Sequence, residues 1–368
     1  MTSYLASRPL SEAASPPRPE ELEISLFGKG VGESLVVHLG DGDWMVVDSF
    51  VDRQTGRPVA LDYLTRLGLS PEKVLRHIVI SHWHDDHTSG ASALLDNAPA
   101  AQVFLSAAFN KKEVRKLLAA SECRTVTPTG VDEMALLLRN LLARKRANSG
   151  GVQLNYLLAK TLVHKSSRSE VFALSPSSGT LTRALAEIVP FLPVGGGPKR
   201  RVSHEPNDLS VVLHVAFPPV AVLLGADLEV RTDSSTGWLA VVGLAGKFCK
   251  SGTFKVAHHG SPNADHPQIW NELLTPSPVA ILTPFLAGRK PLPSHEDLLR
   301  LKSTSIRVLC AGSPAPAKSR DLAPEAQKMV RASGASIRQS EGAVGHVRLR
   351  IDGSGRTMVD LFGAAVEL

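Results

Sequence analysis

An apolar β-branched run that ends in a cluster of histidines and aspartates constrains this chain more than any other feature. The run is Ile78-Val79-Ile80, and Ser81-His82-Trp83-His84-Asp85-Asp86-His87 follows it directly. Such a run predicts a buried strand, and a buried strand does not end in so many ionisable side chains without a compensating interaction. Bound metal supplies that interaction, since imidazole nitrogens and carboxylate oxygens are common metal ligands.

The spacing within this cluster predicts two adjacent metal ions. His82 and His84 occupy alternate positions, so an extended segment turns both side chains to one side. Asp86 and His87 then reach a second point as the chain turns into a helix. We therefore expect one ion at His82 and His84 and another beside it at Asp86 and His87.

Two later apolar segments end in the same kinds of residue. A predicted hairpin over 210–215 and 220–224 is followed by Asp227, and a predicted strand over 253–257 is followed by His258 and His259. Strands that all end in such residues are expected to converge on one site. We expect Asp227 to bridge the two ions, because each oxygen of a carboxylate can bind a different ion.

The remaining pattern predicts an α/β fold, specifically an αββα sandwich. Three short apolar segments, 23–27, 34–39 and 44–47, are separated by glycine-containing turns and indicate a β-meander. Strand and helix patterns alternate from there to a terminal meander over 336–361. We expect one domain over 22–368, preceded by a disordered tail over 1–21 that is rich in Pro, Ser and Ala.

A basic segment interrupts this alternation. Residues 109–170 contain twelve Lys or Arg and five Asp or Glu, an excess larger than the net charge of +6 of the whole chain. Helical patterns over 131–146 and 152–163 predict a basic helical insertion over about 109–168. Concentrated positive charge favours a polyanionic partner such as nucleic acid, although a solvated helical surface accounts for the same composition.

Composition sets the remaining limits. The cysteines Cys123, Cys249 and Cys310 are scattered and show no Cys-x-x-Cys spacing, so neither a disulfide framework nor a thiolate zinc site is indicated. No apolar run is long enough to span a bilayer, and residues 1–21 lack the hydrophobic core of a signal peptide. We expect a cytoplasmic protein without a membrane partner, and the sequence indicates no oligomeric state.

The His-x-His-x-Asp-His pattern, followed by Thr-Ser-Gly, resembles the signature of the metallo-β-lactamase fold superfamily. Within it, the chain is most similar to the lactamase-like domain of ComEC/Rec2-type DNA-uptake proteins and their stand-alone relatives. That similarity is carried by Pro206-Asn-Asp-Leu-Ser210, Leu224-Gly-Ala-Asp-Leu-Glu229, Phe254-Lys-Val-Ala-His-His-Gly-Ser261 and Pro293-Ser-His295. The resemblance implies nuclease or phosphodiesterase activity. It also implies that Asp48 hydrogen-bonds a metal-binding histidine, whereas the sequence alone also allows a helix cap or turn residue there.

The chain departs from the superfamily pattern at one ligand. The usual third histidine of the first metal site would fall just before residue 210, where the chain has Asn207 and Asp208, with His204 slightly upstream. We expect Asp208, rather than His204, to complete the first site with His82, His84 and Asp227. The second site is expected to consist of Asp86, His87, Asp227 and His258, and the ions to be Zn²⁺ or Mn²⁺.

These features predict a metal-dependent hydrolase that cleaves phosphodiester bonds with an activated water. In this mechanism Asp227 bridges the ions, Asp86 orients the water, and His295 or His259 protonates the leaving oxygen. A β-lactamase or thioester hydrolase would leave the basic segment without a role. Two alternatives stay open: an enzyme acting on cyclic nucleotides or other small substrates, and a nucleic-acid-binding protein without turnover, which the missing histidine favours.

Overall fold

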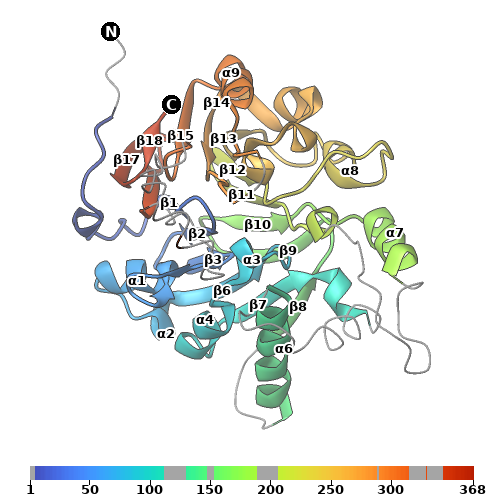
Figure 1. Cartoon of the computed structure of the whole chain (residues 1–368), viewed down its shortest axis with the longest axis horizontal. Helices are drawn as coiled ribbons and strands as arrows, with labels where there is room; N and C mark the ends of the chain where they lie inside the picture. Colours follow the sequence, from blue (N-terminus) through green and yellow to red (C-terminus); the bar gives the residue numbers. More distant parts are fainter. Residues whose placement is uncertain are drawn as a thin grey trace.

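Two eight-stranded sheets lie face to face and carry helices on their outer faces (Figure 1). The computed structural model describes residues 5–111, 130–146, 153–188, 206–287, 290–314, 329 and 343–368. This arrangement confirms the predicted α/β fold class and the αββα sandwich.

The first sheet combines the N-terminal meander with parallel strands. Its strands, in spatial order, are β17 (Thr357–Gly363), β16 (Gly345–Ile351), β1 (Leu22–Gly28), β2 (Glu33–His38), β3 (Trp44–Val47), β6 (Leu75–Ile80), β7 (Gln102–Ser106) and β8 (Leu154–Leu157). Neighbours from β17 to β3 pair antiparallel, and those from β3 to β8 pair parallel. The three segments of the predicted meander are β1, β2 and β3.

The second sheet repeats this plan. Its strands, in spatial order, are β18 (Val366–Glu367), β15 (Arg307–Cys310), β14 (Leu274–Leu282), β13 (Ser251–Lys255), β12 (Val220–Leu224), β11 (Leu213–Phe217), β10 (Glu170–Ala173) and β9 (Thr161–Lys165). The strands from β9 to β12 pair antiparallel, and those from β12 to β15 pair parallel. Each sheet therefore offers parallel strands whose carboxyl ends can build one site.

Three apolar layers hold the sandwich together. Side chains such as Leu26, Val79 and Leu213 fill the space between the two sheets. A second layer lies between the first sheet and its helices, and a third between the second sheet and its helices. The helices are α1 (Val59–Arg66), α2 (Pro71–Val74), α3 (Asp85–Thr88), α4 (Ala91–Asn97), α6 (Gly130–Arg146), α7 (Ser178–Ile188), α8 (Gly237–Val242) and α9 (His295–Thr304). None of the helices in the described part of the chain is long and apolar enough to cross a membrane.

The N-terminal segment is ordered from residue 5 onward, so the predicted disordered tail is wrong for residues 5–21. The Arg8 backbone N–H donates to the Leu361 carbonyl at 2.9 Å, and Ala13 is fully buried. The Arg350 side chain donates to the Ser15 carbonyl. Main-chain hydrogen bonds to β17 fix this segment, and these do not depend on the side-chain composition that suggested disorder.

The basic segment is helical only in part. Helix α6 agrees with the predicted helix over 131–146, but the predicted helix over 152–163 is wrong, since β8 and β9 lie there as edge strands of the two sheets. The turn between these strands passes through Lys160 in a left-handed conformation at φ 73°, without glycine or proline to signal it. Strands of four and five residues are too short for periodicity to separate them from a helix.

Candidate metal centre

The loops that follow β6, β12 and β13 meet at one edge of the sandwich. The loop after β6 supplies His82 and His84 and continues into α3, which carries Asp86 and His87. The loop after β12 supplies Asp227 from the opposite sheet, and the short 3₁₀ turn η5 (Ala257–Gly260) follows β13. These strands belong to the parallel halves of their sheets, so their carboxyl ends share an edge.

Asp48, directly after β3, orients the histidines that follow β6. It is fully buried and has a left-handed backbone at φ 59°. Its Oδ1 accepts a hydrogen bond from the Ser81 backbone N–H at 2.7 Å, and its Oδ2 accepts from the Ser81 hydroxyl at 2.7 Å and from His87 Nδ1 at 2.8 Å. Because Nδ1 of His87 donates to this carboxylate, Nε2 is the nitrogen left to bind a metal. The implied hydrogen bond between Asp48 and a histidine of the site is therefore present.

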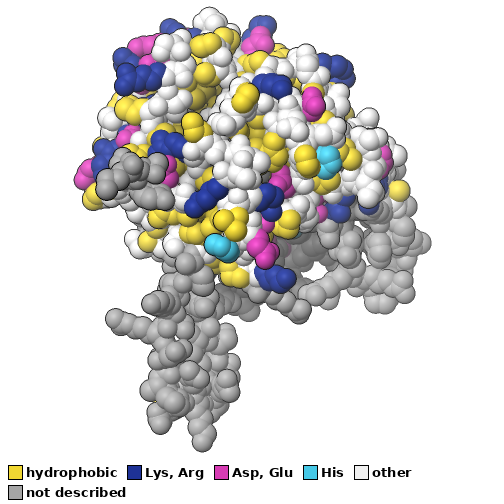
Figure 2. Space-filling view, turned by 90° about the horizontal axis from the view of Figure 1, so that it is seen from above, with side chains coloured by type: hydrophobic (Ala, Val, Ile, Leu, Met, Phe, Trp, Pro, Cys, Tyr) yellow, Lys and Arg dark blue, Asp and Glu magenta, His cyan; other side chains and the backbone are white. Residues whose placement is uncertain are grey.

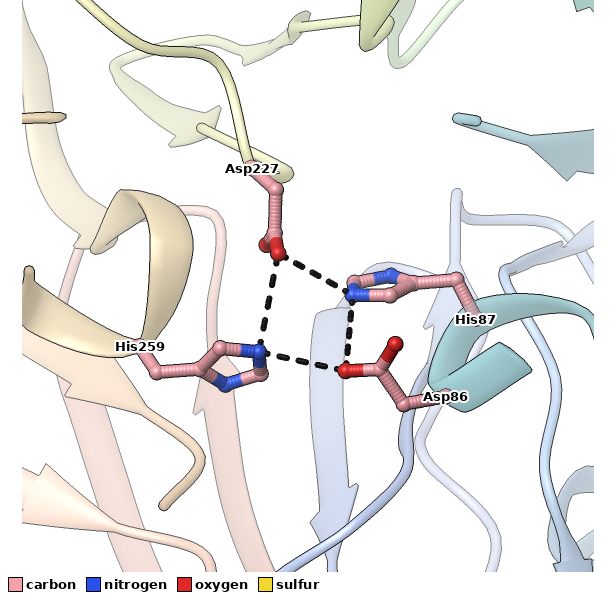
Figure 3. A group of neighbouring side chains, drawn as sticks. All are labelled: Asp86, His87, Asp227 and His259. Carbon is pink, nitrogen blue, oxygen red and sulfur yellow. Dashed lines mark ion pairs between the residues drawn. The ribbon is translucent and has the colours of Figure 1, made fainter. Parts of the chain in front are cut away.

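One group of ligand atoms consists of Asp86, His87, Asp227 and His259 (Figure 3). Nε2 of His87 lies 3.5 Å from Asp86 Oδ2 and 3.4 Å from Asp227 Oδ2. Nε2 of His259 lies 3.3 Å and 3.5 Å from the same two oxygens. Two nitrogens from opposite sides of the sandwich thus face two carboxylate oxygens across a small space.

A second group consists of His82, His84 and the same Asp227. His82 is fully buried, and its Nδ1 lies 2.9 Å from the Ser81 hydroxyl oxygen. Since that hydroxyl donates its own hydrogen to Asp48, it accepts from His82, and Nε2 of His82 is left without a proton. Asp227 therefore belongs to both groups, and its predicted role as a bridge between two ions stays a prediction.

The residues present fit metal ions. Within each group the ligand atoms lie within 4.8 Å of one another. Nε2 of His87, Nε2 of His259 and Oδ1 of Asp227 are buried and have no hydrogen-bond partner among the described residues. Buried polar atoms without partners are costly, and a cation shared between them removes that cost.

Comparison with a protein-family model agrees with a metal-binding site here. Residues 28–104 match the model of the metallo-beta-lactamase superfamily, a superfamily of metallohydrolases. Over these residues the chain is similar to that superfamily. The matched residues include β2, β3, β6, Asp48 and the His82 to His87 cluster. No curated protein matches the chain in sequence.

Several solved structures are similar to this chain at low identity. YhfI from Bacillus subtilis, a metallo-beta-lactamase fold protein, is 10% identical over 80% of this chain and 97% of that one, with a TM-score of 0.43. A metallo-beta-lactamase variant from Cronobacter sakazakii is 15% identical over 58% of this chain and 64% of that one, with a TM-score of 0.34. The short form of human tRNase Z is 12% identical over 63% and 76%, with a TM-score of 0.32. Similarity at this level does not indicate a substrate.

His259, and not the predicted His258, belongs to the four-residue ligand group. Both residues have left-handed backbones, at φ 47° for His258 and φ 54° for His259, which a continued strand would not have. His258 consequently points to Asn263 and Glu229, with Nδ1 3.1 Å from Asn263 Oδ1 and 3.4 Å from Glu229 Oε1. The sequence showed two adjacent histidines but not this turn, because left-handed conformations are uncommon outside glycine.

Asp208 does not join the first group either. Its Oδ1 accepts a hydrogen bond from Arg231 Nε at 2.6 Å, and it is absent from the ligand groups formed by the described residues. His204, the rejected alternative, lies outside the described residues. His295 is the exposed first residue of α9 and belongs to neither group.

Three polar residues behind the site were not predicted. Thr283 follows β14 and lies 3.0 Å from Nδ1 of His259, measured to the hydroxyl oxygen. Glu33 accepts from that hydroxyl, and Lys255 pairs with Glu33. Lys255 stands between Phe254 and Val256 in an apolar strand, and a lysine in such a place was a readable signal of a paired, buried charge.

The buried carboxylates and imidazoles of the site shift one another's pKa when no metal is bound. Burial alone would lower the pKa of His87, but the carboxylates of Asp227, Asp86 and Asp48 raise it well above its usual value. Burial also opposes the rise in the pKa of His259, which Asp227 and Asp86 cause. Conversely, burial would raise the pKa of Asp227, and His87 and His259 hold it well below its usual value. The carboxylates therefore favour the protonated form of both imidazoles when no metal is bound.

Metal binding is consequently expected to release protons. The raised pKa of His87 and of His259 favours the protonated imidazole, and Nε2 must be without a proton to bind an ion. The affinity for Zn²⁺ should rise with pH across the neutral range, by up to about tenfold per pH unit for each proton released. Titration calorimetry in two buffers with different ionisation enthalpies measures the protons released. An affinity independent of pH, with no proton release, would contradict this charge balance.

Proposed function

We propose that this chain is a metal-dependent phosphodiesterase that uses two divalent ions, Zn²⁺ or Mn²⁺. The observation that carries the proposal is the sharing of Asp227 between two groups of ligand atoms. Two ions held by one carboxylate suit the displacement of an oxygen from phosphorus, because one ion can stabilise the attacking oxygen and the other the leaving oxygen.

The roles of the chain's own residues follow from their positions. Divalent ions in such a site lower the pKa of water towards neutrality and offset negative charge on a phosphoryl group. His82, His84, His87 and His259 would hold the ions through nitrogen. The Asp86 side chain, 10% exposed, is the most accessible of the four-residue group. Its carboxylate is therefore best placed to orient an attacking water.

Proton donation to the leaving oxygen needs a group that does not hold an ion. His259, one of the two predicted donors, faces the ligand group with Nε2 and is unsuited to this role. His258 is the better candidate, since its side chain is 21% exposed and its ring centroid lies 6.2 Å from that of His259. His295 remains a weaker candidate on the exposed start of α9.

The charge of the chain, more than the shape of the site, favours a phosphodiester substrate. The excess of Lys and Arg over 109–170 suits a polyanion. Of this segment, Lys112 and residues 113–129 lie outside the described residues, and Arg144 donates to Asp96 Oδ1 at 2.6 Å. Figure 2 shows acidic and basic side chains interspersed on the face that it presents. Since Arg144 is engaged within the fold, a small anionic substrate such as a cyclic dinucleotide is the second candidate.

The test uses the protein loaded with Zn²⁺ or Mn²⁺ and a matched panel of substrates. Linear DNA, circular DNA, RNA, a cyclic dinucleotide, bis(p-nitrophenyl) phosphate and a chromogenic β-lactam are each incubated with the wild type. Chelator treatment and the Asp227→Asn variant serve as controls. We expect chelator-sensitive cleavage of the phosphodiesters and none of the β-lactam. Hydrolysis of the β-lactam alone would overturn the proposal, and cleavage of circular DNA would show an endonuclease.

A further inference from the structure

Lys255, the last residue of β13, is a fully buried lysine beside the candidate metal centre. Lysine is almost never fully buried unless its ammonium group is paired. Here Nζ lies 2.5 Å from Oε1 of Glu33, whose side chain is also fully buried. The strand thus places one ionic pair inside the sandwich, directly behind residues that carry the site.

The same ammonium group reaches the turn that presents Asp227. Nζ donates to the Ala226 carbonyl at 3.0 Å and lies 3.8 Å from Asp227 Oδ1. Ala226 has a left-handed backbone at φ 44°, a conformation that costs energy for a residue with a Cβ. An ammonium group that binds the carbonyl of this turn therefore helps to hold it, and Asp227 is the next residue.

The partner carboxylate reaches the other ligand from the second sheet. The Thr283 hydroxyl donates to Glu33 Oε2 at 2.5 Å, so its oxygen accepts from His259 Nδ1 at 3.0 Å. This direction of hydrogen bonding makes Nε2 of His259, which faces Asp86 and Asp227, the nitrogen that can bind an ion once its proton is lost. Nδ1 of His259 also lies 3.2 Å from the Thr283 backbone carbonyl, which can only accept, so the Thr283 hydroxyl adds a second contact that links this nitrogen to Glu33.

We propose that Lys255 and Glu33 form a positioning pair for the metal centre, an inference that rests on the proposed metal-dependent function. The pair fixes Asp227 through Ala226 and fixes His259 through Thr283. Glu33 also belongs to a group with Asp48 and His87 whose ligand atoms lie close together. The ammonium group of Lys255 already balances the charge of Glu33. This third group therefore already has a cation, which the protein itself supplies.

The test removes both charges at once. Lys255→Met alone would strand a buried carboxylate, so the variant is Lys255→Met with Glu33→Gln, which keeps the net charge and approximate volume. The control is Arg350→Met with Glu23→Gln, another buried pair, with Arg350 Nε 2.8 Å from Glu23 Oε2, away from the site. Zn²⁺ affinity is measured by competition with a chromophoric chelator, alongside the thermal midpoint of the metal-free protein.

We expect both double variants to lower the thermal midpoint, and only the Lys255 and Glu33 variant to lower Zn²⁺ affinity, by about 10- to 100-fold. Wild-type affinity in that variant, or an increase, would overturn the inference and leave the pair a structural element. Should it fail to fold, Thr283→Val breaks the path to His259 while keeping the ion pair, and it should lower affinity by about tenfold. Unchanged affinity in Thr283→Val would equally overturn the inference. If the wild type binds ions but cleaves no phosphodiester, the proposed function fails while this affinity test still stands.

Discussion

Asp227→Asn is expected to leave a folded protein that retains less than one ion per chain and hydrolyses phosphodiesters about 10³-fold more slowly or worse. The carboxylate belongs to both ligand groups, so its loss affects two ions where the loss of any histidine affects one. Asparagine keeps the shape of the side chain but cannot supply two anionic oxygens. Elemental analysis after gel filtration measures the stoichiometry, and bis(p-nitrophenyl) phosphate reports the rate.

Asp208→Asn is the matched control. Asp208 has the same chemistry, also belongs to the second half of the chain, and was the ligand expected from sequence, but its carboxylate is bound to Arg231. We expect two ions per chain in this variant. Loss of an ion from Asp208→Asn, with full occupancy in Asp227→Asn, would reverse the assignment of these two aspartates.

The variants His259→Ala and His258→Ala are expected to differ in ion content and rate, because the two adjacent histidines have different roles. His259→Ala should lose one ion per chain and at least about 10²-fold in rate on every substrate, because Nε2 belongs to the ligand group. His258→Ala should retain both ions, since its nitrogens face Asn263 and Asn207.

The substrate dependence of His258→Ala tests its proposed role. A proton donor contributes about 10²- to 10⁴-fold when the leaving oxygen is basic, and little when the leaving group is already a stable anion. Cleavage of a nucleotide phosphodiester should therefore fall far more than cleavage of bis(p-nitrophenyl) phosphate. Equal losses on both substrates would argue against proton donation, and loss of an ion would restore His258 as a ligand.

The sequence predicts much of the site because the ends of its strands can be located from the pattern of apolar residues. Apolar runs bounded by turns locate β3, β6 and β12, and parallel strands end at a common edge. From that rule alone, His82, His84, Asp86, His87 and Asp227 were expected together, and the structure brings them together. The meander β1 to β3 was equally readable, since glycine-containing turns separate short apolar segments.

What the sequence did not predict depends on local backbone conformation and distant partners. The left-handed turn at His258 and His259 exchanges the directions of the two side chains, and no residue there requires it. Asp208 is removed from the site by Arg231, which is not its neighbour in sequence. The strands β8 and β9 are short, and their pairing partners rather than their own periodicity determine them.

Diffraction from crystals grown with Zn²⁺ or Mn²⁺ tests the account most directly, because anomalous scattering locates each ion independently of activity. We expect two peaks about 3.5 to 4 Å apart. One should lie among Asp86, His87, Asp227 and His259, and the other beside His82 and His84, with Asp227 contacting both. A single peak bound by His258 or Asp208, or no peak at Asp227, would contradict the two-ion site on which the proposed function depends.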